Sequence, residues 1–354
     1  MRVGLAPAMI ALALTGLLAV VSWWGRGEGA LPRAARSSAR DPVAENRRCE
    51  GCHQEIAAEW RASQHRTAFS DPTFQAALAI EPKAFCRNCH APEDPDARTA
   101  DGPHTLGVGC VSCHLAGEVV ISTAEPGVSF ASHRVSRSLA FGSAAACAGC
   151  HEFPFDDGER RVGALDMQRT VSEHASGPDH ERSCASCHMP RTSAGHRSHA
   201  FASTRDADSL RGSVIARAER TSATRVRLEL TSAGVGHAYP TGDLFRRIAV
   251  KAEVEGDEHR VLASATRYLA RHFATGRDRF GAPIREELFD DRLLPGETSV
   301  IELELGSRAR DLPVRWFVSL ERVLSVADHE AISAVVPERV RLAEGELAPL
   351  VTSP

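Results

Sequence analysis

Cys49-Glu-Gly-Cys52-His53 is the first of five copies of a CxxCH pattern, the last of which ends at His188. Together the five copies contain all ten cysteines of the chain. In this pattern the two thiols form thioether bonds to a haem, and the following histidine binds the haem iron. The later copies are Cys86-Arg-Asn-Cys89-His90, Cys110-Val-Ser-Cys113-His114, Cys147-Ala-Gly-Cys150-His151 and Cys184-Ala-Ser-Cys187-His188. The sequence therefore predicts five covalently bound haem c groups, each with the histidine of its motif as an iron ligand.

Zinc sites and disulfides also use paired cysteines. A zinc site does not need a histidine after every pair, and disulfides do not require this fixed spacing. Five haems within one stretch of chain must pack against one another, which leaves room for short helices and little other regular structure. We therefore expect one multihaem domain rather than separate haem-binding units.

The composition limits the classes of partner. The chain has 354 residues, enough for two ordinary domains. Its 42 Lys and Arg residues nearly balance 46 Asp and Glu residues, for a formal net charge of −4. The propionates of bound haems would make the protein more acidic still. Because the sequence has no basic stripe, we do not expect nucleic acid as a partner.

The N-terminus predicts export. No charged residue occurs from Val3 to Trp24, a stretch long enough to span a bilayer as a helix, and no clean Ala-x-Ala site follows it. We favour an uncleaved signal-anchor over residues 1–24, with a cleaved signal peptide as the alternative, and a linker over residues 25–45. Since haem is attached to CxxCH after export, we expect an N-terminally anchored protein on the periplasmic side of the inner membrane. A soluble periplasmic or exported form is the alternative.

The C-terminal region has a different pattern. It lacks cysteine, and apolar residues alternate with polar ones in the segments RVRLEL, IAVKAEV and VIELELG. Alternation with period two, between turn signals such as LPGETS, predicts the strands of an antiparallel β-sandwich. The predicted fold class is α+β with several domains. A mainly helical, loop-rich multihaem cytochrome c domain over residues 46–208 precedes an antiparallel β-sandwich-like domain over residues 209–345.

Two histidines outside the motifs occur in distinctive settings. Ile56 and Trp60 are four residues apart and predict a helix through His65, which places His65 about 18 Å from His53 along the helix axis. We therefore expect His65 to bind the iron of a neighbouring haem. His237 occurs in GVGHAYPTGD, where glycines and a proline predict a compact loop whose backbone can approach a bulky group.

Residues 46–250 resemble a known group, the exported multihaem cytochromes c related to the tetrahaem electron acceptor of hydroxylamine oxidoreductase. The resemblance rests on CEGCHQEIAAEWRASQH, FCRNCHAP, GVGCVSCH, CAGCHEF, MQRT, CASCHMP, SHAF and GHAYPTGDLFRR. It implies closely stacked haems, most of them bound by two histidines. The second, distal ligands implied by the resemblance are His65, His133, His199 and His237.

The ligand set of the remaining haem is left open. Its distal ligand is one of His104, His174, His180 and His196, or is absent; related chains tend to have Trp at the position of His174. The histidines of the C-terminal region, other than His237, have no haem-like surroundings in the sequence and are not expected to be ligands. These are His259, His272 and His329.

Two functions are compatible with these features. The first is electron transfer between redox protein partners by a membrane-tethered pentahaem cytochrome without a substrate of its own. The alternative is a reductase or oxidase of a small nitrogen or sulfur compound, which needs an iron with an open position. No motif is CxxCK, the catalytic variant in which a lysine binds the iron. A catalytic haem cross-linked to tyrosine is poorly supported, because the chain has only Tyr239 and Tyr268. We therefore favour an electron carrier over an enzyme. The sequence predicts no particular donor or acceptor.

Overall fold

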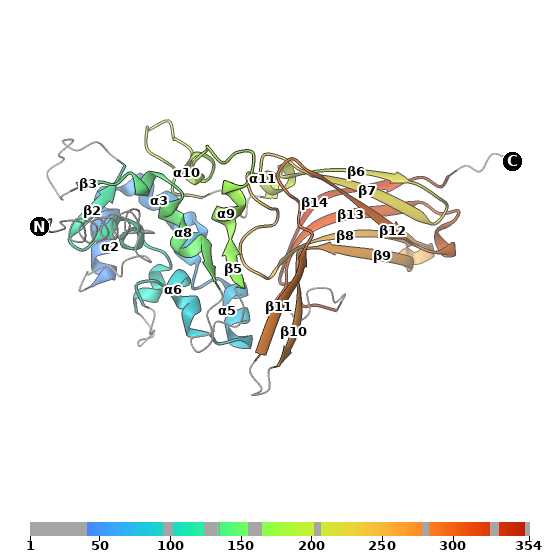
Figure 1. Ribbon diagram of the computed structural model, residues 1–354, viewed down its shortest axis with the longest axis horizontal. Coiled ribbons are helices and arrows are strands. Elements are labelled where there is room, and N and C mark those ends of the chain that lie inside the picture. The colour runs from blue at the N-terminus through green and yellow to red at the C-terminus, as the bar shows by residue number, and fades with distance from the viewer. Residues whose placement is uncertain are drawn as a thin grey trace, which may run out of the picture.

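The computed structural model describes residues 41–94, 102–123, 133, 135–154, 165–201, 207–277, 283–325 and 333–350. The helical part, which is the described residues from 41 to 201, lies beside the β part, which is those from 207 to 350 (Figure 1). Short helices and several antiparallel sheets confirm the predicted mixed α+β class. The expected anchor and linker over residues 1–45 lie almost wholly outside the described residues. Within those residues, no helix is long and apolar enough to cross a membrane.

The helical part is built from short helices joined by irregular chain. Its α-helices are α2 (Pro42–Cys52), α3 (Gln54–Ala62), α4 (Gln64–Thr67), α5 (Pro72–Ile80), α6 (Arg87–His90), α7 (Cys110–His114), α8 (Ala145–His151), α9 (Thr170–Ala175) and α10 (Cys184–His188). Its 3₁₀ turns are η1 (Ala84–Cys86), η2 (Pro103–Leu106) and η3 (Ala140–Gly142). Each CxxCH motif therefore lies at the end of a short helix, and its histidine is the last helical residue or, for His53, the residue that caps the helix.

The predicted continuous helix through His65 is wrong at Ser63. Ser63 has extended backbone angles, ends α3 and begins α4. Its hydroxyl donates to the carbonyl of Trp60 at 2.7 Å and accepts from the amide of Arg66 at 3.3 Å. Serine competes well for backbone groups at helix ends, and here it closes one helix and caps the next. The short turn of α4 thus carries His65 in a new direction.

The β part contains two larger antiparallel sheets. One has the order β12 (Thr298–Glu304), β7 (Arg225–Ser232) and β6 (Val214–Arg220). The other has the order β14 (Glu338–Leu347), β13 (Val314–Arg322), β8 (Arg246–Glu255) and β9 (Val261–Leu269). A separate hairpin pairs β10 (Arg271–Arg277) with β11 (Pro283–Asp290), and helix α11 (Ala207–Gly212) precedes β6. The hairpin projects from the sheets beside the helical part (Figure 1).

One apolar core joins the two larger sheets. Alternate residues of β7 and β8 are fully buried, as their sequence pattern predicts, and they pack with residues of β12 and β13. The helical part has few buried apolar side chains by comparison. Those that the structure describes are Ala57, Trp60, Phe74, Ala91, Leu106 and Val111. Two small sheets also occur there, β1 (Leu115–Ala116) with β2 (Val119–Ser122) and β3 (Val135–Arg137), and β4 (Glu152–Pro154) with β5 (Asp166–Arg169).

Candidate haem-binding site

The CxxCH motifs lie close to one another although the chain separates them. A hydrogen bond between the thiols of Cys49 and Cys110 lowers the pKa of Cys49 to about 7. A similar bond from Cys147 lowers the pKa of Cys184 to about 6. The thiols of Cys89 and Cys150 are also hydrogen bonded. These contacts bring the first motif beside the third, the fourth beside the fifth, and the second beside the fourth. Cofactors bound at these motifs would therefore be neighbours.

Four of the motif histidines lie opposite a second imidazole. The ring centroids are separated by 6.3 Å in His53–His133, 6.4 Å in His151–His65, 6.1 Å in His114–His199 and 6.2 Å in His188–His237. Two imidazoles bound to one metal ion from opposite sides have centroids about 6.3 Å apart, since each metal–nitrogen bond is about 2.0 Å long. Each pair therefore has the separation that one iron with two histidine ligands requires.

The hydrogen bonds of these rings favour the same role. The Nδ1 atoms of His114, His199 and His237 lie 3.0, 2.8 and 3.0 Å from backbone carbonyl oxygens. A carbonyl can only accept, so Nδ1 carries the proton and Nε2 keeps a free lone pair for a metal. Burial lowers the pKa of all three imidazoles, and of His65 to about 4, which keeps them in the neutral form that binds metal. The residues thus fit the haem that the CxxCH motifs imply.

His90 has different surroundings. Its Nδ1 donates to the carbonyl of Ala68 at 2.7 Å, as in the other motif histidines, but its ring stacks on Phe74 with centroids 3.7 Å apart. Burial lowers its pKa, and the charged groups of Arg322 and Asp243 lie near enough to affect it. In the part of the chain that the structure describes, the ring in contact with His90 is this phenyl ring and not a second imidazole.

The four open candidates for the remaining distal ligand have different surroundings. His104 hydrogen bonds to Asp94 at 2.7 Å, and the exposed His180 bonds to the carbonyl of Gly177 at 3.1 Å. Both ring nitrogens of His196 are within hydrogen-bonding distance of other side chains. His174 lies against Gly236, close to the His188–His237 pair. The described ring contacts therefore pair none of these four histidines with His90.

The three histidines of the β part that were not expected to be ligands can be placed in part. His272 is buried, and its Nε2 lies 2.8 Å from a carboxylate oxygen of Asp291. His259 is exposed at the end of a turn and lies 3.4 Å from Glu255. Neither is in ring contact with a motif histidine among the described residues. His329 lies outside them.

Two supports of the histidine pairs could not be found from the sequence. Glu59, in α3, bonds through one carboxylate oxygen to Nε2 of His196 at 3.0 Å and accepts the amide of His199 at 2.8 Å through the other. Asn46, fully buried in α2, accepts the amide of Cys110 at 2.8 Å and so caps helix α7 of the third motif. Neither residue has a recognisable motif, because its partners are distant in the sequence.

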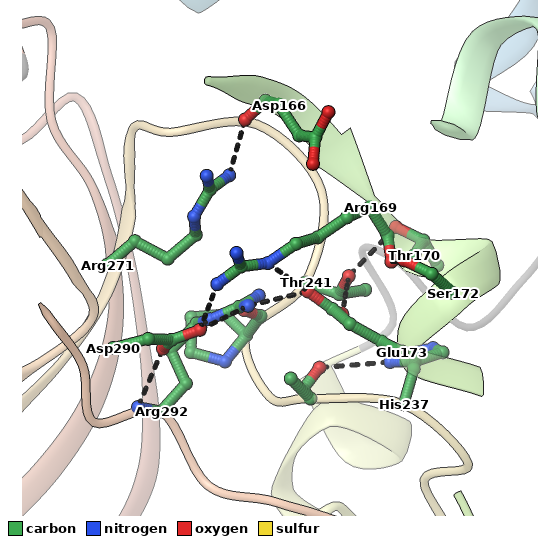
Figure 2. A network of polar contacts seen from close by, with 12 residues as sticks. Asp166, Arg169, Thr170, Ser172, Glu173, His237, Thr241, Arg271, Asp290 and Arg292 are labelled. Carbon is green, nitrogen blue, oxygen red and sulfur yellow. Dashed lines mark hydrogen bonds and ion pairs between the residues drawn. The ribbon is translucent and has the colours of Figure 1, made fainter. Parts of the chain in front are cut away.

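An ionic network joins the helical part to the β part (Figure 2). Arg169, next to α9, pairs with Glu287 at 2.8 Å and with Asp290 at 2.6 Å. Arg271 of β10 bonds to Glu287 at 2.6 Å and to the carbonyl of Asp166 at 2.8 Å. Figure 2 shows Arg169, Asp290 and Arg271 near Thr241 of the loop that carries His237. The network therefore fixes the β part against the segment that precedes the fifth motif.

Comparison with known proteins agrees with this site. Residues 48–115 match the family described as cytochrome c554 and c-prime. The structure is similar to that of a penta-heme cytochrome c552 from Thermochromatium tepidum, with a TM-score of 0.65 and 19% identity over 89% of this chain and 99% of that chain. No curated protein sequence matches the chain. The findings support a multihaem cytochrome c. The family match includes the first three CxxCH motifs, and the likeness to the solved structure concerns the fold.

Proposed function

We propose that this protein is an exported pentahaem cytochrome c that transfers electrons between redox protein partners. The observation that carries the proposal is the set of four imidazole pairs with centroids 6.1–6.4 Å apart, each containing one CxxCH histidine. Bound at such a pair, a haem c supplies an iron that changes between the ferric and ferrous states. With two histidines on each of four irons, those irons have no position free for a substrate.

Each distal histidine also connects one segment of the chain to the haem site of another. His133 follows the third motif but lies opposite the histidine of the first. His65 follows the first motif and lies opposite that of the fourth. His199 follows the fifth motif and lies opposite His114 of the third. We propose that this exchange of ligands between segments holds the five haem sites at short, fixed separations, as electron transfer between them requires.

The location and the partners are also proposals. The uncharged segment from Val3 to Trp24 supports a membrane tether on the periplasmic side of the inner membrane, and haem attachment to CxxCH supports export. The two sheets that share one core support a sandwich-like domain in the β part. We propose that this domain helps to dock the cytochrome on its redox partners. The suggested relation to the electron acceptor of hydroxylamine oxidoreductase remains part of this proposal.

Haem content and spin state test the proposal directly. A pyridine haemochrome assay on washed holoprotein should give five haems per chain, and EPR of the ferric protein should show at least four low-spin irons. A content clearly below five, in a host with working haem attachment, would contradict the attachment at all five motifs. Fewer than four low-spin irons would contradict the histidine pairs.

A second candidate function rests on His90. Among the described residues, no ring contact pairs His90 with a second imidazole as in the four pairs, so the iron at Cys86 and Cys89 is the one where a small nitrogen or sulfur compound could bind. This function predicts one high-spin ferric iron that becomes low-spin when cyanide is added. Five low-spin irons without added ligand would exclude it and leave the electron carrier.

A further inference from the structure

His237 differs from the other distal histidines because the β part carries it. The loop from Gly234 to Asp243 begins after β7, and Tyr239 in it pairs with Leu293 through two backbone hydrogen bonds of 2.8 and 3.0 Å. The loop is therefore attached to the β part on one side. Its imidazole lies 6.2 Å from that of His188, which belongs to the helical part. The contacts that hold this loop in place therefore also determine whether the imidazoles of His237 and His188 lie opposite each other.

A buried ion pair holds the loop immediately after His237 (Figure 2). Glu173 of α9 accepts the hydroxyl of Thr241 at 2.7 Å through one carboxylate oxygen and pairs with Arg292 at 2.5 Å through the other. Arg292 also donates to the carbonyl of Pro240 at 3.0 Å. The ion pair thus holds two successive loop residues: Arg292 bonds to Pro240, and Glu173 bonds to Thr241.

The pair is shielded from water. The side chains of Arg292 and Glu173 are 4% and 10% exposed. Asp290 bonds to the same guanidinium at 2.8 Å, so that two carboxylates surround one buried arginine. Ion pairs in such surroundings are screened little by salt, and loss of one member leaves the other charge buried without its partner. The geometry is therefore far more constrained than that of a surface ion pair.

Two glycines show how closely the loop lies against the helical part. A Cβ atom on Gly177 would lie 2.8 Å from the carbonyl oxygen of Gly236, closer than such atoms approach. A Cβ atom on Gly236 would lie 3.1 Å from that of Asp179. The loop therefore has no room to move toward the segment after α9, and Arg292 prevents it from moving away.

We propose that Glu173 and Arg292 are positioning residues that hold His237 opposite His188, so that docking of the β part sets the ligands of the haem at Cys184 and Cys187. The inference rests on the proposed function, in which His237 is that haem's distal ligand. Groups that orient a metal ligand commonly alter both ligand binding and reduction potential when they are removed. Here Glu173 belongs to the helical part and Arg292 to the β part, so separation of the two parts would move His237 away from the iron.

The test compares six variants of the full-length holoprotein, the last of which is the conservative Arg292→Lys. Arg292→Met and Glu173→Gln each break the pair. Thr241→Val removes the hydroxyl that bonds to Glu173 and to Thr170, and it keeps the test available if the first two variants fold poorly. Arg285→Met is the matched control: Arg285 pairs with Glu81 between the same two parts, away from the loop. His237→Met reports separately whether His237 is a ligand.

EPR spin count and cyanide binding are the measurements. We expect one iron to leave the low-spin, bis-histidine signal in His237→Met, and the same iron to do so partly or fully in Arg292→Met and Glu173→Gln. Thr241→Val should show the same iron binding cyanide faster than the parent, and Arg285→Met should match the parent. Arg292→Lys should restore part of the parental signal.

Two results would overturn the inference. In the first, His237→Met changes one bis-histidine signal while Arg292→Met, Glu173→Gln and Thr241→Val keep the parental spectrum and cyanide rate. His237 would then bind iron without help from the pair. In the second, Arg285→Met changes the same iron as strongly, which would mean that general loosening of the two parts is responsible. A parental spectrum in His237→Met would instead overturn the ligand assignment in the proposed function.

Discussion

Replacing Glu59 by alanine should weaken the helical part and disturb one histidine pair. The carboxylate accepts the amide of His199 at 2.8 Å and lies 3.0 Å from His196, with 24% of the side chain exposed. Burial opposes its charge, but the His199 amide and His196 outweigh burial and hold the pKa below its usual value. A hydrogen bond to a charged group contributes about 1.5–3 kcal/mol, and a partly exposed ion pair adds little. We expect the free energy of unfolding to fall by about 2–3 kcal/mol.

Urea unfolding of the oxidised holoprotein, followed by circular dichroism in the Soret band, measures this loss. Glu55→Ala is the matched control, because Glu55 is exposed on the same helix, and Glu59→Gln should lose less than Glu59→Ala because its amide oxygen can still accept the His199 amide. A carboxylate with a lowered pKa stabilises the fold above its unfolded pKa, near 4.5, and loses this effect as the pH falls further. The difference between parent and Glu59→Ala should therefore be full at pH 7 and shrink below pH 4.5. Equal urea midpoints for Glu59→Ala and Glu55→Ala at pH 7 would refute the reasoning.

Three further outcomes are expected. Gly109→Ala should lower the free energy of unfolding by about 1–3 kcal/mol in the same urea assay, because its Cβ would lie 2.7 Å from the amide oxygen of Asn46; an unchanged midpoint would contradict this. Burial opposes the charge of Asp290, but Arg292 outweighs burial and holds the pKa of Asp290 at about 2. Acidification from pH 4 toward pH 2 should therefore lower the free energy of unfolding of the parent by about 1–2 kcal/mol, a contribution that Asp290→Asn lacks at every pH. Parallel pH profiles of the two proteins would show that the ion pair contributes nothing. The protein should remain with membranes after carbonate washing, and a mature N-terminus between residues 25 and 40 by mass spectrometry would show a cleaved leader instead.

The sequence predicted the features that depend on local pattern. The spacing within CxxCH requires a short helical turn, and each motif has one. Alternation in RVRLEL and IAVKAEV predicted β7 and β8, because the apolar residues on one face of each strand are fully buried in the core, although the other face of β8 is also largely buried. The break at Ser63 was missed, because the residues on both sides of it are good helix formers and only the cap contacts show the change of direction.

Features that depend on distant residues could not be predicted. His196 follows Glu59 by 137 residues, and Arg292 follows Glu173 by 119. Neither pair has a sequence pattern, since from the sequence any carboxylate could be paired with any cationic side chain. The hairpin of β10 and β11 was also missed: many of its residues are charged, and their partners lie in the helical part. The spacing of the sequence suggested a neighbouring haem for His65 alone, and the full set of distal histidines came from a family resemblance. Nothing in their local sequence assigns each of them to a particular motif.

The uneven distribution of buried apolar side chains has a consequence for how the protein is made. The β part has a continuous core and can collapse without a cofactor, whereas the helical part buries few apolar residues among those described. The segment with the cysteines leaves the ribosome first, yet we expect this segment not to fold without haem. We therefore expect newly exported chain to keep its thiols accessible to the attachment machinery until haem arrives. A cell short of haem should then accumulate a protein whose C-terminal half resists proteolysis while its N-terminal half is degraded.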